Sequence, residues 1–287
     1  MWLTLDFRSR AGRRALFSFI GWVMCGCAFV LVAFPLFDIL VIIFRKGVTA
    51  ISPELFTTVT NGVSGGLLNA IEGTLVLSGG SLVFAVPVGV IAGVHLSEYG
   101  GGWYGNLVRF LCDVLTGVPS IVLGYFAYVT LVVELGWQFS ALAGAITLAI
   151  MIVPYIARFT ELEFSHIPYS LREAGYALGM KERTVIARIL FPIAWPGILT
   201  GILLALSISV GETAPLIYTA GWSNYLWNGQ LTKEPIGYLT YVIWSFINMP
   251  FESAHALAFA AAFLVVFTVL LINIGARTLI KRRQLFD

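Results

Sequence analysis

The residues of this chain most suited to chemistry are an acid and its helix-breaking neighbours within a long apolar run. They form the stretch Gly211-Glu212-Thr213-Ala214-Pro215. A carboxyl group inside a membrane span costs a few kcal/mol and normally faces a cavity or a partner group. Glycine and proline interrupt the helix there, and the freed backbone groups can line a solute path. We therefore expect Glu212 to act in gating or in a structural ion pair.

A second interrupted stretch also places glycine and proline within an apolar run: Thr116-Gly117-Val118-Pro119-Ser120-Ile121-Val122. It predicts a second broken helix beside a solute path, with ordinary kinking as the alternative for Pro119 taken alone. Arg158 and Glu161 lie three residues apart, so they can pair on one helix face. The alternative for Arg158 is a positive anchor at the end of a span.

The spacing of the other reactive residues argues against an enzyme or a metal protein. The three histidines are scattered, no H-E-x-x-H motif occurs, and the three cysteines lack metal-type spacing. A nucleotide-binding P-loop requires Gly-Lys, whereas none of the four lysines follows a glycine: Lys46, Lys181, Lys233, Lys281. We therefore expect a non-catalytic chain that binds no cofactor itself.

The composition predicts that these residues lie within a membrane protein. Apolar residues make up 59% of the 287 residues and charged residues only 11%, whereas a soluble domain carries about a quarter charged residues. A membrane helix needs about 20 mainly apolar residues. Six stretches approach or exceed that length, which predicts an all-α membrane protein with about six transmembrane helices: 16–44, 71–94, 107–133, 135–157, 193–220 and 254–276.

The basic residues predict how these spans are oriented. If the N-terminus is cytoplasmic, all but three of the 17 Lys and Arg residues fall on the cytoplasmic side, as the positive-inside rule requires. The sequence thus predicts cytoplasmic termini at 1–15 and 277–287, an outer loop at 45–70, and a retained anchor helix at 16–44. A seventh span at 235–251 would break the rule, so we expect a re-entrant or interfacial helix there.

The segment 158–192 is a long, charged connection on the cytoplasmic side. Ser170 and Glu173 form a capping-box pattern, which predicts a helix from Leu171, and Gly179 is suited to end it. A second helix is predicted from Lys181 until Pro192 stops it. Four apolar residues near the turn lack an obvious covering surface, which favours a partner groove over a plain connector: Tyr176, Ala177, Leu178 and Met180.

Within this hairpin the residues follow the spacing E-A-A-x3-G-x9-I-x-L-P, with Gly175 and Phe191 as the two departures. The pattern resembles the coupling segment of binding-protein-dependent ABC importer permeases. The resemblance implies a MetI-like fold whose coupling helices dock in a cleft of an ATPase that hydrolyses ATP on partner subunits. It assigns this coupling to Glu173, Ala174, Gly175, Tyr176, Ala177, Leu178, Gly179, Met180, Ile189 and Pro192.

Three stretches, 116–122, 168–174 and 211–216, further resemble the PstA-type permeases of phosphate ABC transporters. The likeness runs from about residue 69 to the C-terminus, over a transmembrane domain at 71–276. It implies a bacterial or archaeal inner-membrane location and three kinds of partner: a PstC-like second permease, a PstB-like ATPase dimer and a PstS-like phosphate-binding protein outside. It assigns the translocation path or gating to Gly117, Pro119, Ser120, Arg158, Gly211, Glu212, Thr213 and Pro215.

One departure leaves the substrate open. Such permeases usually carry an arginine where this chain has Ile208. Arginine is well suited to an anionic solute, so either the partner permease supplies the cation or the solute differs. The alternatives are another oxyanion, a small polar solute or, in a different class, an ion-coupled secondary transporter, which would leave the hairpin unexplained.

Overall fold

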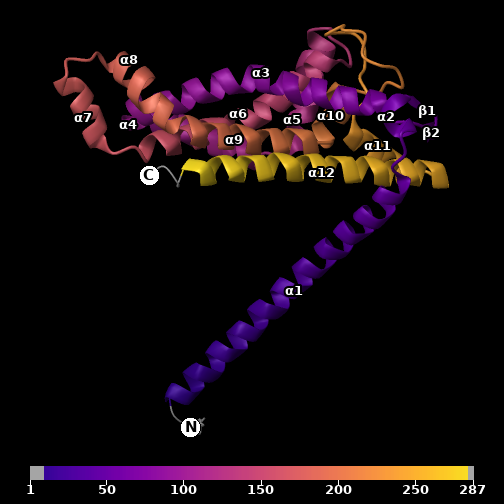
Figure 1. Cartoon of the computed structure of the whole chain (residues 1–287), viewed down its shortest axis with the longest axis horizontal. Coiled ribbons are helices and arrows are strands. Elements are labelled where there is room, and N and C mark those ends of the chain that lie inside the picture. The colour runs from indigo at the N-terminus through magenta and orange to yellow at the C-terminus, as the bar shows by residue number, and fades with distance from the viewer. Residues whose placement is uncertain (1–9, 284–287) are drawn as a thin grey trace.

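The computed structural model describes residues 10–283, and these form a helical bundle with one projecting helix (Figure 1). Five helical stretches are long and apolar enough to cross a membrane, and a bent pair raises the number to six. The long helices are α1 (Arg10–Ala50), α3 (Leu68–Tyr99), α6 (Ala141–Ser165), α9 (Phe191–Gly211) and α12 (Glu252–Arg283). The bent pair is α4 (Gly102–Gly117) with α5 (Ser120–Ala127) and the π-helical η1 (Tyr128–Glu134).

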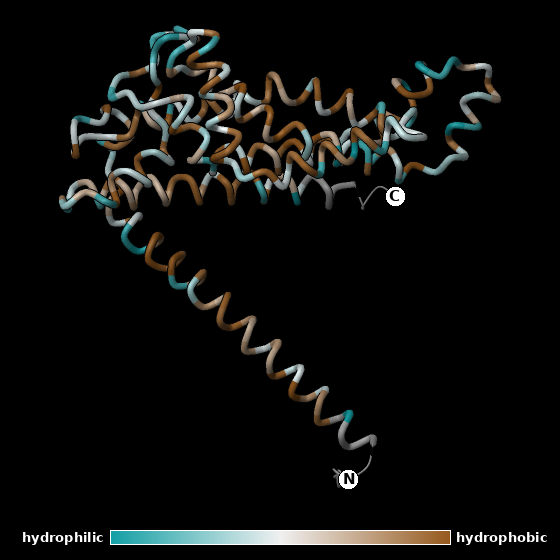
Figure 2. The backbone as a smooth tube through the Cα atoms, turned by 180° about the vertical axis from the view of Figure 1, so that it is seen from behind, coloured by the Kyte–Doolittle hydropathy of each residue, from teal (hydrophilic) through white to brown (hydrophobic). Residues whose placement is uncertain are grey.

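The helices α3, α6, α9 and α12 lie side by side and form the bundle (Figure 1). Small residues let α3 and α6 approach closely, since a Cβ atom on Gly93 would lie 2.5 Å from the carbonyl oxygen of Ala157. Apolar residues follow these helices, whereas hydrophilic residues gather in the connections at the two ends (Figure 2). This pattern matches a bundle whose middle lies in lipid.

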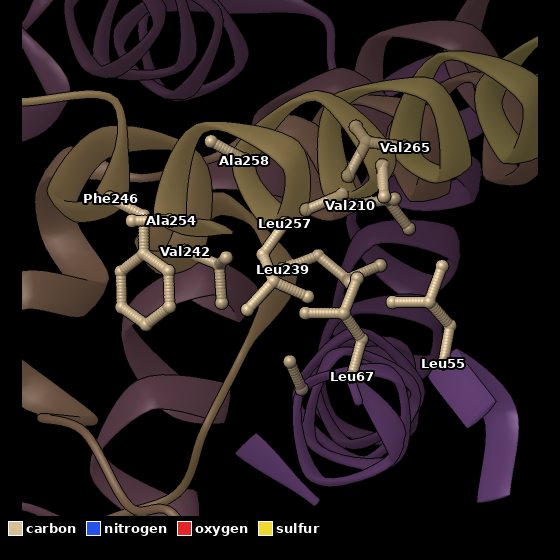
Figure 3. Close-up of a cluster of buried hydrophobic side chains, with 13 residues drawn as sticks. Leu55, Leu67, Val210, Leu239, Val242, Phe246, Ala254, Leu257, Ala258 and Val265 are labelled. Carbon is tan, nitrogen blue, oxygen red and sulfur yellow. The ribbon is translucent and has the colours of Figure 1, made fainter. Parts of the chain in front are cut away.

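A buried cluster joins the bundle to the short elements at one end. Figure 3 shows side chains of α9, α11 (Leu239–Phe246) and α12 meeting Leu55 of α2 (Glu54–Thr57) and Leu67, which precedes α3. Beside it, the buried Asn69 side chain accepts hydrogen bonds from Thr60 and donates one to the carbonyl of Ser223, at 2.8 Å. This amide fixes the loops at this end of the bundle to the start of α3.

Helix α1 leaves the bundle near the β-hairpin end and projects away from it (Figure 1). Its C-terminal part contacts α12, where Phe44 packs edge-on against Phe263 and the Lys46 ammonium lies 4.7 Å from the ring centre of Phe259. The rest of the helix exposes large apolar side chains. Such a surface is stable only in lipid or against another apolar surface.

Several predicted boundaries are wrong. The first span continues to Ala50, and the segment 45–70 also holds a short hairpin of β1 (Thr60–Asn61) and β2 (Ser64–Gly65) within the mainly helical fold. The stretch 107–133 is not one straight helix, because its halves meet at 99°. The fourth span begins at Ala141 instead of residue 135. The hydroxyl of Ser140 accepts a hydrogen bond from the backbone N–H of Ala143 and so caps this helix.

The uncertain segment 235–251 is not a seventh span among the described residues. It contains α11, whose eight residues reach only about 12 Å. The helix packs against α12 and α3, and its place at the membrane interface stays a prediction. The hairpin at 166–190 and the last residues of α12 lie at the end of the bundle opposite β1 and β2 (Figure 1). The predictions for residues 1–9 and 284–287 fall outside the described chain.

Candidate functional site

The first arm of the predicted hairpin is α7 (Tyr169–Ala177). It begins earlier than predicted, because Pro168 takes the N-cap position and the capping box of Ser170 does not form. It ends as predicted at Gly179, whose φ of 75° suits glycine. The N–H of Gly179 donates to Tyr176 O and that of Met180 to Gly175 O, which is a Schellman motif.

The coupling-motif residues divide between two faces of α7. Glu173, Ala174, Tyr176, Ala177, Leu178 and Gly179 are exposed, and Leu178 is 80% exposed. Gly175 instead faces inward, where an added Cβ would lie 2.8 Å from a methyl group of Val185. Met180 and Ile189 pack against the buried cluster of α6 and α9. One face of the hairpin is thus held by the bundle while the other stays open.

The second arm does not end at Pro192, contrary to the prediction. It runs from α8 (Glu182–Val185) through the π-helical η2 (Ile186–Leu190) directly into α9, with Pro192 in the first turn. A π-helical segment changes the hydrogen-bond register just where proline lacks an N–H, so the helix continues. The first arm is also separate from Arg158, since α6 extends to Ser165.

Both predicted interruptions are present. After Gly117, Val118 and Pro119 are extended, because the residue before proline is pushed out of the helical region, and α5 then begins at Ser120. After Gly211, the chain is extended at Glu212 and resumes as α10 (Ala214–Thr219), with Pro215 in its first turn. Gly117 and Gly211 are exposed and have no heavy atom within 4 Å of an added Cβ.

The fold brings the two interruptions together. A Cβ on Gly124 of α5 would lie 2.5 Å from the Cα of Pro215, so α5 and α10 touch backbone to backbone. The Ser120 side chain lies beside the carboxyl group of Glu212. The Thr240 hydroxyl of α11 donates to the Glu212 carbonyl oxygen at 2.8 Å. Six of the eight predicted path residues therefore form one junction, which we call the paired break: Pro119, Ser120, Gly211, Glu212, Thr213 and Pro215. Gly117, at the end of α4, lies beside it.

Arg158 does not join the paired break. Its predicted partner is confirmed, since Arg158 Nη1 donates to Glu161 Oε2 at 2.8 Å, and Nε lies 3.5 Å from Asp113 Oδ1 of α4. The other Glu161 oxygen accepts from Arg109, which also donates to two carbonyls near the end of α3. Two cations and two acids thus connect α4 to α6 one turn before Gly117.

Sequence reasoning missed two groups at this site. Thr240 was not considered as a partner of the broken helix, and Glu98 was not considered at all, although it pairs with Arg172 on α7. Thr240 is 28 residues from Glu212, and Arg172 is 74 residues from Glu98, so no local sequence pattern could have indicated either pair. Within residues 10–283, no cluster of His, Cys, Asp and Glu could hold a metal ion.

The geometry agrees with comparisons to known proteins. A family model described as "Binding-protein-dependent transport system inner membrane component" matches residues 85–284. The phosphate transport system permease protein PstA 2 of Mycobacterium bovis is 44% identical over 269 residues, covering 93% of this chain and 89% of the relative. The PstA protein of Yersinia pestis is 42% identical, covering 88% and 86%.

A solved structure shows the same fold. The inward-facing MetNI methionine ABC transporter matches with a TM-score of 0.59 and 21% identity, covering 81% of this chain and 99% of the other. The MetI-like fold, the resemblance to PstA-type permeases and the role of a non-catalytic, multi-pass inner-membrane subunit are thereby confirmed. Because the family model and these relatives cover most of its length, the chain belongs to the family of binding-protein-dependent transport system inner membrane components.

Proposed function

We propose that this chain is the permease subunit through which an ABC importer moves inorganic phosphate into the cell. Its relatives of 44% and 42% identity carry the name of phosphate transport permeases. The observation that carries the proposal is the paired break, because two interrupted helices face each other and leave backbone groups and an acid on a shared surface. Interrupted helices of this kind line solute paths in transporters.

The open face of α7 supports docking to an ATPase. Tyr176 is 42% exposed and Leu178 is 80% exposed at the end of the bundle opposite the β-hairpin (Figure 1). Apolar side chains on a charged helical hairpin favour a covering groove. The coupling motif then transmits the closure of a PstB-like ATPase dimer, which binds and hydrolyses ATP, while this chain binds no cofactor.

The complete importer needs two further partners. A PstC-like second permease covers the open side of the paired break, and a PstS-like binding protein delivers phosphate at the end that carries the β-hairpin. With α7 facing the ATPase, both termini are cytoplasmic. Alternating access follows when closure of the ATPases shifts one permease against the other.

The charges of this chain bear on the choice of solute. Ile208 packs against the apolar cluster of α3, α6 and α9, and both Arg109 and Arg158 pair with acids. An anion in a low-dielectric path needs compensating donors or positive charge. The second permease therefore supplies the cation for phosphate, and the alternative solutes are another oxyanion or a small polar molecule.

The test is ATP hydrolysis by the four kinds of subunit reconstituted in proteoliposomes. Phosphate, sulfate, molybdate and an uncharged solute are titrated through the binding protein. Stimulation by phosphate alone supports the proposal. Stimulation by another solute would identify that solute as the substrate instead, and no stimulated hydrolysis at all would refute the importer.

A pair of charge reversals tests the docking face in the same vesicles. Glu173→Lys on α7 is expected to abolish stimulated hydrolysis and ATPase co-purification. Glu134→Lys is the matched control, because it makes the same charge change at an exposed position on η1, before the start of α6. Equal effects of the two variants would remove α7 from the docking site.

A further inference from the structure

The guanidinium group of Arg172 joins three segments at the base of the coupling helix. Its Nη2 and Nε donate to the two oxygens of Glu98, in the last turn of α3, at 2.7 and 3.1 Å. Its Nη1 donates to Ile167 O at 2.9 Å and Nη2 also donates to Phe164 O at 3.0 Å, both at the end of α6. One side chain of α7 thus holds the ends of α3 and α6.

The burial of this group makes its geometry rigid. Arg172 is 9% exposed, and the Glu98 side chain is 8% exposed. The hydrogen bond to Glu98 raises the pKa of Arg172, so the cation persists at every physiological pH. Carbonyls at a helix end lack helical donors and attract positive charge, so the same cation also caps α6.

The two helices held by Arg172 are also packed tightly against each other. A Cβ on Gly89 of α3 would lie 2.7 Å from a side-chain carbon of Ile156 on α6, and the contact at Gly93 is equally close. Helix α6 in turn carries Glu161, which pairs with Arg109 of α4. A displacement of the α6 end therefore reaches α4, whose last residue is Gly117 beside the paired break.

We infer that Arg172 and Glu98 form a positioning pair that makes the coupling helix α7 move as one body with α3 and α6. The inference rests on the proposed function, because it explains how force on the open face of α7 reaches the helices. Without the pair, α7 stays attached through Gly175 to α8 and η2, yet it no longer carries α3 and α6 with it. ATP is then hydrolysed without moving solute.

The first test measures motion in the wild-type complex. Spin labels are placed at Ile91→Cys on α3 and Tyr169→Cys on α7, both exposed, with the native cysteines replaced by alanine. The distance between the labels is expected to stay the same in the nucleotide-free and the vanadate-trapped states. A distance that changes between these states overturns the inference, even if no Arg172 variant folds.

The second test measures solute transported per ATP hydrolysed. Arg172→Lys keeps the charge but cannot bond both Glu98 oxygens and two carbonyls at once. We expect this ratio to fall about tenfold in Arg172→Lys and in Glu98→Gln, the size of a typical coupling between sites, with ATPase co-purification retained. The control is Arg183→Lys, at an exposed position on α8, which is expected to leave the ratio of solute transported to ATP hydrolysed unchanged.

The outcomes separate the two proposals. If the wild-type complex shows no phosphate-stimulated hydrolysis, the proposed function fails. If the wild type is active and Arg172→Lys transports as much solute per ATP, the positioning pair fails while the importer stands. A loss of expression that affects hydrolysis and transport in proportion would indicate a purely structural ion pair and would also overturn the inference.

Discussion

Replacing Gly124 with alanine is expected to disrupt the contact between α5 and α10 at the paired break. The added Cβ would lie 2.5 Å from the Cα of Pro215 and 3.1 Å from its Cβ. Carbon atoms in ordinary contact stay about 3.5 to 4.0 Å apart, so α5 and α10 must separate by about 1 Å. The Pro215 Cα belongs to the backbone, and it cannot rotate away as a flexible side chain does.

The cost follows from two opposing effects. Overpacking costs about 1 to 3 kcal/mol, whereas alanine regains up to about 1 kcal/mol over glycine in a helix. We expect a net loss of about 1 to 2 kcal/mol in the stability of the folded state. A separation of about 1 Å also displaces Pro215, three residues after Glu212, so transport should fall further than stability alone explains.

Two measurements check this prediction, namely the thermal unfolding temperature of the purified complex and phosphate uptake in proteoliposomes. The matched control is Gly79→Ala on α3, where the position is exposed and no heavy atom lies within 4 Å of the new Cβ. Because alanine is up to about 1 kcal/mol better than glycine within a helix, we expect Gly79→Ala to be at least as stable as the wild type and to take up phosphate at the same rate. Equal behaviour of the two variants would refute the reasoning about the paired break.

Three further predictions follow from single contacts. Gly179→Ala is expected to cost about 1 to 2 kcal/mol in thermal unfolding, because its φ of 75° is left-handed, and Gly179→Asn to cost less. Asn69→Leu is expected to lower stability by about 1 to 3 kcal/mol, because the buried N–H of Thr60 loses its acceptor, whereas Asn69→Asp retains it. Glu212→Gln is expected to abolish phosphate uptake with normal membrane insertion, and uptake at the wild-type rate would remove the acid from gating.

Local sequence patterns were sufficient for the spans and for much of the hairpin. Runs of about 20 apolar residues define membrane helices because the lipid core has a fixed thickness. Proline and glycine at Pro119 and Gly211 predicted the interruptions, since these residues act on the backbone next to them. The same holds for Gly179, whose left-handed conformation ends α7 as predicted.

The angles and partners at the site depended on the tertiary structure. The 99° bend between α4 and α5 depends on the packing of α4 against α6 and of α5 against α10. The π-helical register that carries the helix through Pro192 is likewise not encoded by any local pattern. The capping box of Ser170 was wrong because Pro168 starts the helix first.

Apolar length, proline and glycine act locally, so a membrane bundle with two interrupted helices and a helical hairpin could be predicted from the amino-acid sequence. Three arrangements became visible only in the folded chain: Ser120 lies beside Glu212, Arg158 stays apart from them, and Arg172 binds Glu98. Each pairing joins residues from different helices, and it exists only once close packing has fixed how those helices lie against one another.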